Sequence, residues 1–455
     1  MGVMITAENK KLYFHSVTLD RDKCKGCTNC IKHCPTEAIR VRGGKAKIIK
    51  ERCIDCGECI RVCPHKAKRA VTDTLGALAD FRYNIALPAP ALYGQFNHLK
   101  DINLVLTGLK KLGFDNIYEV AKATEAITDY TRKLLAEGTL KRPIINSACP
   151  AVVRLICVRF PSLIPHILPL ISPMEAAARA ARREAAQKTD LPPEEIGVFF
   201  LSPCAAKATA VRNPIGLSSS PVSGVISIKE IYLKLLPILG RLDSVEPLST
   251  CAFAGVNWAQ SGGEASALKN EKYVAADGIH NVVKLLEEIE DDETLDIDFI
   301  EALSCTGGCV GGPLNVENTF VAKTKIKNLA GALKKSGQKT APVPLSESEL
   351  CWQQPVVYRN VMNLDDDLAV ALQKMQNMEE LARRLPQLDC GSCGAPSCKA
   401  LAEDIVRGFA NESDCIYKLR ETVRDLAKQM FELEEQMPGS FQEDARERQE
   451  EHEHS

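Results

Sequence analysis

Three short cysteine motifs, far apart in a chain of 455 residues, constrain the fold more than any other feature. They occupy 146–150 (Asn-Ser-Ala-Cys-Pro), 202–207 (Ser-Pro-Cys-Ala-Ala-Lys) and 305–312 (Cys-Thr-Gly-Gly-Cys-Val-Gly-Gly). Together they supply four thiols, and four thiolates can hold a cubane iron-sulfur cluster. The glycines allow the backbone to approach a bulky inorganic group closely. The fold is therefore expected to bring the three segments together around one metal centre.

The three motifs resemble those that hold the H-cluster of the diiron (FeFe) hydrogenases. In that family four cysteines bind a 4Fe-4S cluster, and one of the four also bridges to a diiron unit that carries carbonyl and cyanide ligands. The resemblance implies that the cubane is bound by Cys149, Cys204, Cys305 and Cys309, with Cys309 as the bridge. It also implies that Lys207 hydrogen-bonds a cyanide ligand. The family fold has two lobes, each with a small parallel sheet, that close on the H-cluster.

The departures from the family pattern concern proton transfer and the pocket. Ala148 occupies the position of a cysteine that relays protons in catalytic members, whose first motif reads Thr-Ser-Cys-Cys-Pro. Ser202 and Leu303 replace methionines, and the glycine run after Cys309 is shortened to Gly311-Gly312-Pro313. A chain that keeps the ligands and loses the relay resembles the sensory branch of the family. Ala148 could also be a small residue packed beside a cluster, but a methyl group cannot shuttle protons.

The resemblance implies a slow, reversible interconversion of H2 with protons and electrons, coupled through 4Fe-4S clusters to a signalling output. An ordinary metabolic hydrogenase is the second hypothesis, and the absence of a thiol at Ala148 argues against it. A non-catalytic protein with a cubane but no diiron unit is the third, and Lys207 and the third motif argue against that. The expected partners are H-cluster maturation proteins and a redox or signalling protein.

Lys207 and the missing relay each have an ordinary interpretation. A lysine is usually solvated. Lys207, however, follows the apolar run 196–201 and a Pro-Cys pair, so we expect it to be buried and to donate to an anionic ligand. In catalytic relatives an upstream glutamate pair continues the relay, and a predicted helix at 120–134 offers Glu125 and Asp129 for that pair. Ser147 and Cys157 are the candidates to substitute for the missing thiol.

Eight further cysteines form a doubled C-x2-C-x2-C-x3-C-P motif near the N-terminus. This is the bacterial two-cluster ferredoxin signature, in which the fourth cysteine of each run ligates the other cluster. A pair of zinc sites would normally lack the trailing Cys-Pro. The first predicted 4Fe-4S cluster uses Cys24, Cys27, Cys30 and Cys63, and the second uses Cys53, Cys56, Cys59 and Cys34.

A fourth group of cysteines lies near the C-terminus. It is similar to a small iron-sulfur domain of corrinoid and carbon-monoxide-dehydrogenase-associated proteins, and we expect it to hold a third accessory 4Fe-4S cluster. A zinc ribbon is the alternative, since four cysteines alone do not choose the metal. The ligands are Cys390, Cys393, Cys398 and Cys415. The remaining thiols, expected to be buried and inert, are Cys157, Cys251 and Cys351.

Composition limits the cellular compartment that we expect for the chain and the classes of partner that it could bind. The net charge is −2 and the pI about 6.5, which gives no electrostatic footprint for nucleic acid. With no signal peptide evident, the cysteine spacings favour a reducing, anaerobic cytoplasm. The most apolar stretch, 151–171, contains Arg154 and Arg159, so we expect buried helix and loop and no membrane contact. No Walker loop or dinucleotide-binding glycine motif is present.

The overall prediction is a multidomain α/β protein. Apolar strand-like runs at 85–87, 142–145, 197–200 and 224–226 alternate with helical stretches, which indicates largely parallel sheet. The predicted divisions are a lead (1–22), a two-cluster ferredoxin module (23–80), a two-lobed H-cluster domain (84–331), a linker (332–364), a small iron-sulfur domain (365–415), a coiled-coil helix (416–437) and a disordered tail (438–455).

The C-terminal helix carries an apolar repeat with alternating steps of three and four residues. A 3.5-residue repeat over three heptads indicates a left-handed coiled coil, most simply in a homodimer. Packing of the same helix on its own core is the alternative. The repeat consists of Ile416, Leu419, Val423, Leu426, Met430, Leu433 and Met437.

Overall fold

The computed structural model describes residues 13–291 and 296–436. The predicted tail, residue 437 and most of the predicted N-terminal lead lie outside this range. The chain forms two compact units: Met1–Ala38 with Ile48–Met362, and Ile39–Lys47 with Asn363–Ser455. Within the described residues, no helix combines the length and apolarity needed to cross a membrane.

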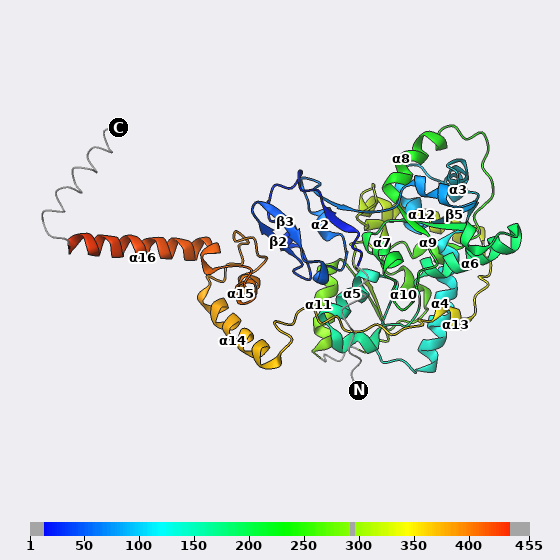
Figure 1. Ribbon diagram of the computed structural model, residues 1–455. Helices are drawn as coiled ribbons and strands as arrows, with labels where there is room; N and C mark the ends of the chain where they lie inside the picture. The colour runs from blue at the N-terminus through cyan, green and yellow to red at the C-terminus, as the bar shows by residue number, and fades with distance from the viewer. Residues whose placement is uncertain (1–12, 292–295, 437–455) are drawn as a thin grey trace. The chain divides into compact units, whose positions relative to one another are not determined.

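The larger sheet of the first unit is parallel and has the strand order β6-β5-β8-β9. Strand β8 is buried along its whole length, as expected for a parallel strand covered on both faces. Helices α3, α6 and α8 are labelled around this sheet in Figure 1. The bounds are β5 (Tyr83–Pro88), β6 (Asn116–Ile117), β8 (Ile196–Ser202), β9 (Gly224–Ser227), α3 (Ile102–Lys111), α6 (Pro173–Thr189) and α8 (Ile228–Leu239).

The smaller sheet is also parallel and has the strand order β10-β11-β7. The prediction of an α/β protein with small parallel sheets is therefore confirmed. The bounds are β7 (Ile144–Ile145), β10 (Tyr273–Asp277), β11 (Phe299–Leu303), α5 (Pro150–Arg159) and α11 (Ile279–Glu290).

Each cysteine motif follows the carboxyl end of a strand. The first motif follows β7, the second follows β8, and the third follows β11. Open α/β sheets place ligands at this edge. Because β8 belongs to one sheet and β7 and β11 to the other, both sheets contribute to one centre. Cys204 directly precedes helix α7 (Ala205–Arg212), which carries Lys207.

The ferredoxin-like part of the first unit is built from short elements. Strand β1 pairs antiparallel with β4, and two one-turn helices carry predicted ligands. The bounds are β1 (Val17–Leu19), α1 (Asn29–Lys32), η2 (Lys50–Arg52), α2 (Glu58–Arg61) and β4 (Lys68–Ala70).

Further helices complete the first unit and correct one predicted boundary. Helix α12 runs to Ser336, so the predicted linker at 332–364 starts inside a helix. Leu333 packs against the core, and Gly337, with a φ of +69°, ends the helix. The bounds are η3 (Leu75–Asp80), η4 (Pro90–Gln95), α4 (Val120–Glu137), η5 (Pro161–His166), η6 (Pro193–Glu195), α9 (Phe253–Asn257), α10 (Gly263–Ala267), η7 (Cys309–Gly311), α12 (Thr319–Ser336) and α13 (Glu347–Leu350).

The second unit joins a hairpin from the ferredoxin sequence to the C-terminal domain. Arg40 and Arg42 both pair with the buried Asp404, at 2.7 and 2.8 Å. The Val41 amide donates to the Gly394 carbonyl at 2.8 Å. The sequence prediction kept this hairpin with the ferredoxin module and did not foresee these contacts. The bounds are β2 (Ile39–Arg42), β3 (Lys45–Ile48), α14 (Leu368–Arg384), α15 (Cys398–Val406), η8 (Glu412–Asp414) and α16 (Ile416–Glu435).

Candidate metal centre

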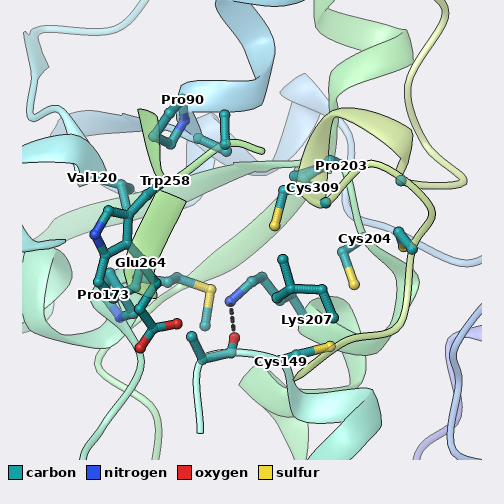
Figure 2. A pocket seen from close by; sticks show the side chains of 18 of the residues that line it. Pro90, Val120, Cys149, Pro173, Pro203, Cys204, Lys207, Trp258, Glu264 and Cys309 are labelled. Atoms are coloured by element: carbon teal, nitrogen blue, oxygen red, sulfur yellow. Dashed lines mark hydrogen bonds between the residues drawn. The ribbon is translucent and has the colours of Figure 1, made fainter. Parts of the chain in front are cut away.

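A cavity of about 870 Å³ lies where the three motifs meet. The cavity is lined by all four predicted cubane ligands, Cys149, Cys204, Cys305 and Cys309, and by Lys207. Figure 2 shows the sulfur atoms of Cys149, Cys204 and Cys309 around the Lys207 side chain.

The four thiols lie close enough to influence one another electrostatically. Burial raises the pKa of Cys204, Cys305 and Cys309, and the charges of the neighbouring cysteines raise it further. Without a metal, the raised pKa values keep the thiols of Cys204, Cys305 and Cys309 protonated, so these thiols gain nothing from their proximity. Metal binding reverses this, because the metal displaces the thiol protons, which are released to solvent, and binds the thiolates. The donor set therefore fits an iron-sulfur cluster.

The glycines of the third motif are needed for backbone contact. A Cβ on Gly311 would lie 2.0 Å from the Thr306 carbonyl oxygen, and one on Gly312 would lie 2.2 Å from the Pro203 carbonyl oxygen. Gly308 has a φ of +90°, which side chains rarely adopt. The second and third motifs thus touch through their main chains, which fixes Cys204 relative to Cys309.

Lys207 is buried, as the sequence suggested, with 8% of its surface exposed. Its Nζ donates to the carbonyl oxygen of Ala148 at 3.1 Å, drawn as a dashed line in Figure 2. It also lies 5.9 Å from the centre of the Phe200 ring. An ammonium has three donors, so an anionic ligand in the cavity can accept from the others.

Two further donors on the cavity wall lack a partner. The Nε1 of Trp258 and the Oγ of Ser304 are buried, line the cavity, and have no hydrogen-bond partner among the described residues. Buried donors are normally satisfied. Together with Lys207 they make a wall that fits a bound group with hydrogen-bond acceptors, such as cyanide ligands.

The residues that depart from the family pattern are placed differently from one another. Ala148 and Leu303 line the cavity. Ser202 is fully buried but does not line it. Its Oγ donates to the Cys204 carbonyl and accepts from the Cys204 amide, both at 3.0 Å. Ser202 therefore holds the backbone of a predicted ligand, and does not replace a methionine side chain in the cavity.

None of the four residues considered for proton transfer lines this cavity: neither the two helix carboxylates nor the two candidates to replace the thiol. Glu125 accepts a hydrogen bond from Thr340, and Asp129 pairs with Arg132 at the surface. The Ser147 hydroxyl donates to the Leu170 carbonyl at 2.8 Å and lines a separate cavity of about 300 Å³. Burial raises the pKa of Cys157 to about 11.

Two glutamates that the sequence analysis missed line the cavity instead. Glu264, on α10, and Glu301, on β11, are 3% and 1% exposed. Asn146 donates to Glu264 at 2.7 Å and accepts from the Ala302 amide at 2.9 Å. The amides of Gly262 and Ala265 donate to the two oxygens of Glu301 at 3.0 and 2.8 Å.

Burial raises the pKa of both carboxyl groups well above the ordinary value, and the charge of Glu301 raises that of Glu264 further. Two buried carboxylates cannot easily be charged together. The pair therefore keeps a proton near neutral pH at a position open to the cavity. A glutamate inside the apolar strand 299–303 was the available sequence signal for Glu301.

The predicted accessory ligands also gather as groups. Cys30 is influenced by the charges of Cys24, Cys27 and Cys63, and Cys56 by those of Cys34, Cys53 and Cys59. This is the crossed arrangement expected for two ferredoxin clusters. In the second unit, Cys393 is influenced by Cys390 and Cys415, and Cys398 begins α15. The identity of the bound metals stays a prediction.

The three thiols outside these groups behave differently. Cys157 and Cys251 are buried, at 5% and 0% exposure. Cys351 was expected to be buried as well, but it is partly exposed. It precedes the surface residues 353–355, because the chain leaves the core just after Leu350.

Family models match three parts of the chain. The C-terminal domain of the iron-only hydrogenase large subunit matches residues 82–273 and 243–313, a 4Fe-4S dicluster domain matches 16–64, and an Fe-S cluster domain matches 385–417. The NADP-reducing hydrogenase subunit HndD of Solidesulfovibrio fructosivorans is 23% identical over 340 residues, which cover 64% of this chain and 55% of HndD. A ferredoxin of Methanothermococcus thermolithotrophicus is 47% identical over 38 residues, 8% of this chain and 63% of the ferredoxin.

Solved structures with a similar fold include a variant of the FeFe-hydrogenase HydA1 from Chlamydomonas reinhardtii, with a TM-score of 0.47 and 17% identity. The similarity covers 64% of this chain and 100% of that one. The structure of HydA(deltaEFG), which concerns stepwise H-cluster assembly, has a TM-score of 0.46 and 17% identity, with coverage of 64% and 100%. The chain spans about half of the length of HndD and about two thirds of the ferredoxin.

Proposed function

This chain belongs to the family of iron-only hydrogenase large subunits, and from this premise we propose that it binds an H-cluster and interconverts H2 with two protons and two electrons, slowly and reversibly. The observation that carries the proposal is the convergence of four thiols and Lys207 on one cavity of about 870 Å³. When bound, the diiron unit supplies the site at which H2 is split or formed.

The residues of the chain bind and orient this group. Cys149, Cys204, Cys305 and Cys309, which line the cavity, would hold the cubane through their thiolates. Lys207 donates to an anionic ligand in a poorly solvated cavity, where an ammonium needs such a partner. Trp258 and Ser304 offer two further donors. Donors fixed before the ligand arrives cost no reorganisation when it binds.

Proton transfer is the step that distinguishes this chain. The methyl group of Ala148 cannot accept a proton at the place where catalytic relatives have a thiol. The pair Glu264 and Glu301 can hold a proton beside the cavity, because burial raises the pKa of both. We propose that this pair serves as a slower proton store in place of the thiol.

A sensory role follows from slow turnover combined with an intact ligand set. A detector must bind H2 and change its redox state, whereas a metabolic enzyme must also release protons quickly. We propose that electrons leave through the accessory 4Fe-4S clusters to a redox or signalling protein in an anaerobic cytoplasm. A metabolic hydrogenase is the alternative, and the Ala148 methyl argues against it. A cluster protein without a diiron unit is the other, and buried Lys207 argues against it.

Helix α16 is proposed to pair with a second copy of the chain. None of its residues is buried, so the apolar repeat does not pack on a core of its own chain within the described residues. Its a positions include β-branched residues and its d positions are all leucine, which favours a two-stranded parallel coiled coil. The a positions are Ile416, Val423 and Met430, and the d positions are Leu419, Leu426 and Leu433.

Infrared spectroscopy combined with metal analysis tests the function. Protein matured with H-cluster assembly factors should show carbonyl and cyanide bands that respond to H2. Four 4Fe-4S clusters require about 16 iron atoms before the diiron unit is added. A cubane without such bands would favour the non-catalytic alternative. About 12 iron atoms with one zinc would instead contradict the cluster at Cys390, Cys393, Cys398 and Cys415.

A further inference from the structure

Arg61 joins the ferredoxin-like part of the chain to the third cysteine motif. It is the last residue of α2 and stands between Cys59 and Cys63, which are predicted to bind two different clusters. Its Nη1 donates to the carbonyl oxygen of Gly311 at 3.0 Å. Its Nε lies 3.3 Å from the carboxylate of Glu58, and its side chain is 29% exposed.

The guanidinium also lies beside a predicted cubane ligand. The Arg61 side chain hydrogen-bonds that of Cys305, in addition to its bond to Gly311 and its contact with Glu58. The two side chains therefore interact directly, across the boundary between the ferredoxin-like sequence and the third motif.

The same boundary is closely packed one turn earlier. Gly57 has a φ of +77°, and a Cβ added there would lie 2.5 Å from Cγ of Pro313. No larger residue fits without displacing the proline. Pro313 follows the third motif directly, so Gly57 and Arg61 bracket a short interface with that motif. The close packing at Gly57 fixes the backbone of α2 against the third motif, and the contacts with Gly311 and Glu58 hold the guanidinium.

We propose that Arg61 is a positioning residue that sets the reduction potential of the cubane bound at Cys305, and thereby how electrons are shared between this cubane and the ferredoxin clusters. The proposal rests on the proposed function, because it requires a cubane at this site. Hydrogen bonds to cluster sulfurs and nearby charge are among the factors that tune the potential of iron-sulfur clusters. A fixed cation stabilises the reduced cluster, which is more negative by one charge.

Arg61 is suited to this task because its charge does not depend on pH in the physiological range. Its planar group can also donate to Gly311 and to Cys305 at once, whereas the ammonium of a lysine is a point charge without this fork. A role confined to fastening the two segments would need the bond to Gly311 alone. The two roles predict different effects on the potential.

The test is a redox titration of the protein loaded with 4Fe-4S clusters but without the diiron unit, followed by electron paramagnetic resonance. Arg61→Gln should lower the potential of the Cys305 cubane by about 59 mV, which is a tenfold change for a one-electron couple. Arg61→Lys should lower it less. Arg69→Gln removes the same charge from an exposed position on β4 and should leave this cubane unchanged.

An unchanged potential in Arg61→Gln, with all clusters present, would overturn the proposal. If that variant does not assemble, Arg61→Lys decides, and an unshifted potential in it has the same consequence. Failure of the proposed function gives a different result. If the chain holds the cubane but no diiron unit, the matured wild-type protein lacks carbonyl and cyanide bands while the Arg61 variants still shift the potential. If the chain holds no cubane here, the wild-type protein contains about four iron atoms fewer than the four clusters require.

Discussion

Helix α4 and strand β11 border the same cavity with different chemistry. The buried face of α4 carries threonines at 124, 128 and 131, and each hydroxyl donates to a carbonyl of its own helix. Strand β11 carries Glu301, which lies with Glu264 beside the cavity. Of these threonines only Thr124 lines the cavity, so the α4 wall has one hydroxyl, already engaged by the backbone, while the other wall has a carboxyl pair that retains a proton.

This difference shows where a proton can be held once the thiol is lost. An aliphatic hydroxyl neither gives up nor accepts a proton readily near pH 7, and these three already donate their hydrogen bond within the helix. A carboxyl group whose pKa is raised toward neutrality is well matched to proton exchange near pH 7. Any proton transfer is therefore expected on the β11 side of the cavity.

We expect the largest effect on activity from substitution of Lys207. Without this lysine the diiron unit is not inserted, and neither wall of the cavity can then take part in proton transfer. Lys207→Met removes the ammonium and leaves an anionic ligand of the diiron unit unpaired in a buried site. We expect loss of diiron insertion and therefore complete loss of activity, while the cubane remains. Infrared and iron analysis measure this. If the variant kept the carbonyl and cyanide bands of the wild type, Lys207 would not be needed for diiron insertion, and the comparison of the two walls would have no basis.

Glu264→Gln tests the β11 wall directly. The amide can still accept the hydrogen bond from Asn146, but it cannot take up a proton. A positioned proton relay typically contributes about 10² to 10⁴ in rate, so isotope exchange between D2 and water should fall by this order. The matched control is Glu125→Gln, which lies away from the cavity. Equal exchange rates in the wild type and the Glu264 variant would contradict the proposal that protons are held on the β11 side of the cavity.

The same variant should alter the pH dependence of stability. Because burial raises the pKa of Glu264, the folded state binds its proton more tightly than the unfolded state, in which the pKa is about 4.3. This stabilisation is complete below the unfolded value and is lost as pH rises through the folded value. Denaturant unfolding of Glu264→Gln should therefore show a smaller loss of stability over that interval.

Restoring the thiol is expected to have a smaller effect than removing the carboxyl. Ala148→Cys places an acid-base group at the cavity, but the α4 wall offers no acid to continue the relay. We therefore expect an increase of less than about 10² in H2 oxidation and proton reduction. Ala148→Ser is the control of similar size. A wild type that already matches metabolic enzymes, or shows no H2-dependent spectral change, would refute the sensory role.

The cysteine centre could be predicted from the sequence because its information is local. Cysteine spacing, and strand-like runs at 142–145 and 196–201, place the first two motifs at strand ends. The strand before the third motif, β11, was recognised only in the structure. The glutamate pair could not be found in this way. Glu264 and Glu301 are far apart in sequence and meet only because α10 packs against β11. Glu125 and Asp129 were chosen for their place on α4, where the structure turns both away from the cavity.

Arg61 and the hairpin at 39–47 were missed for a related reason. An arginine between two cluster cysteines reads as a solvated residue until its partner Gly311 is known. Likewise, the role of Arg40 and Arg42 becomes evident only from their ion pairs with the buried Asp404, more than 350 residues later in the sequence. Contacts of this kind depend on tertiary structure, and no periodicity or residue spacing in the sequence predicts them.

The smallest effect on the cavity is expected from helix α16. Replacing Leu426 and Leu433, which are 53% and 64% exposed, by aspartate puts charge into the proposed dimer interface and should dissociate the dimer. Metal content and H2 turnover should not change, because both residues lie outside every cluster-binding group. Sedimentation measures the association. The control is Lys428→Asp, at a position outside the apolar repeat.

Because a short coiled coil should still associate at roughly tens of micromolar, a wild-type monomer at that concentration would rule out the pairing. If turnover fell together with dimer formation, the cavity would depend on the second copy of the chain. That copy would then contribute to the site in addition to the α4 and β11 walls.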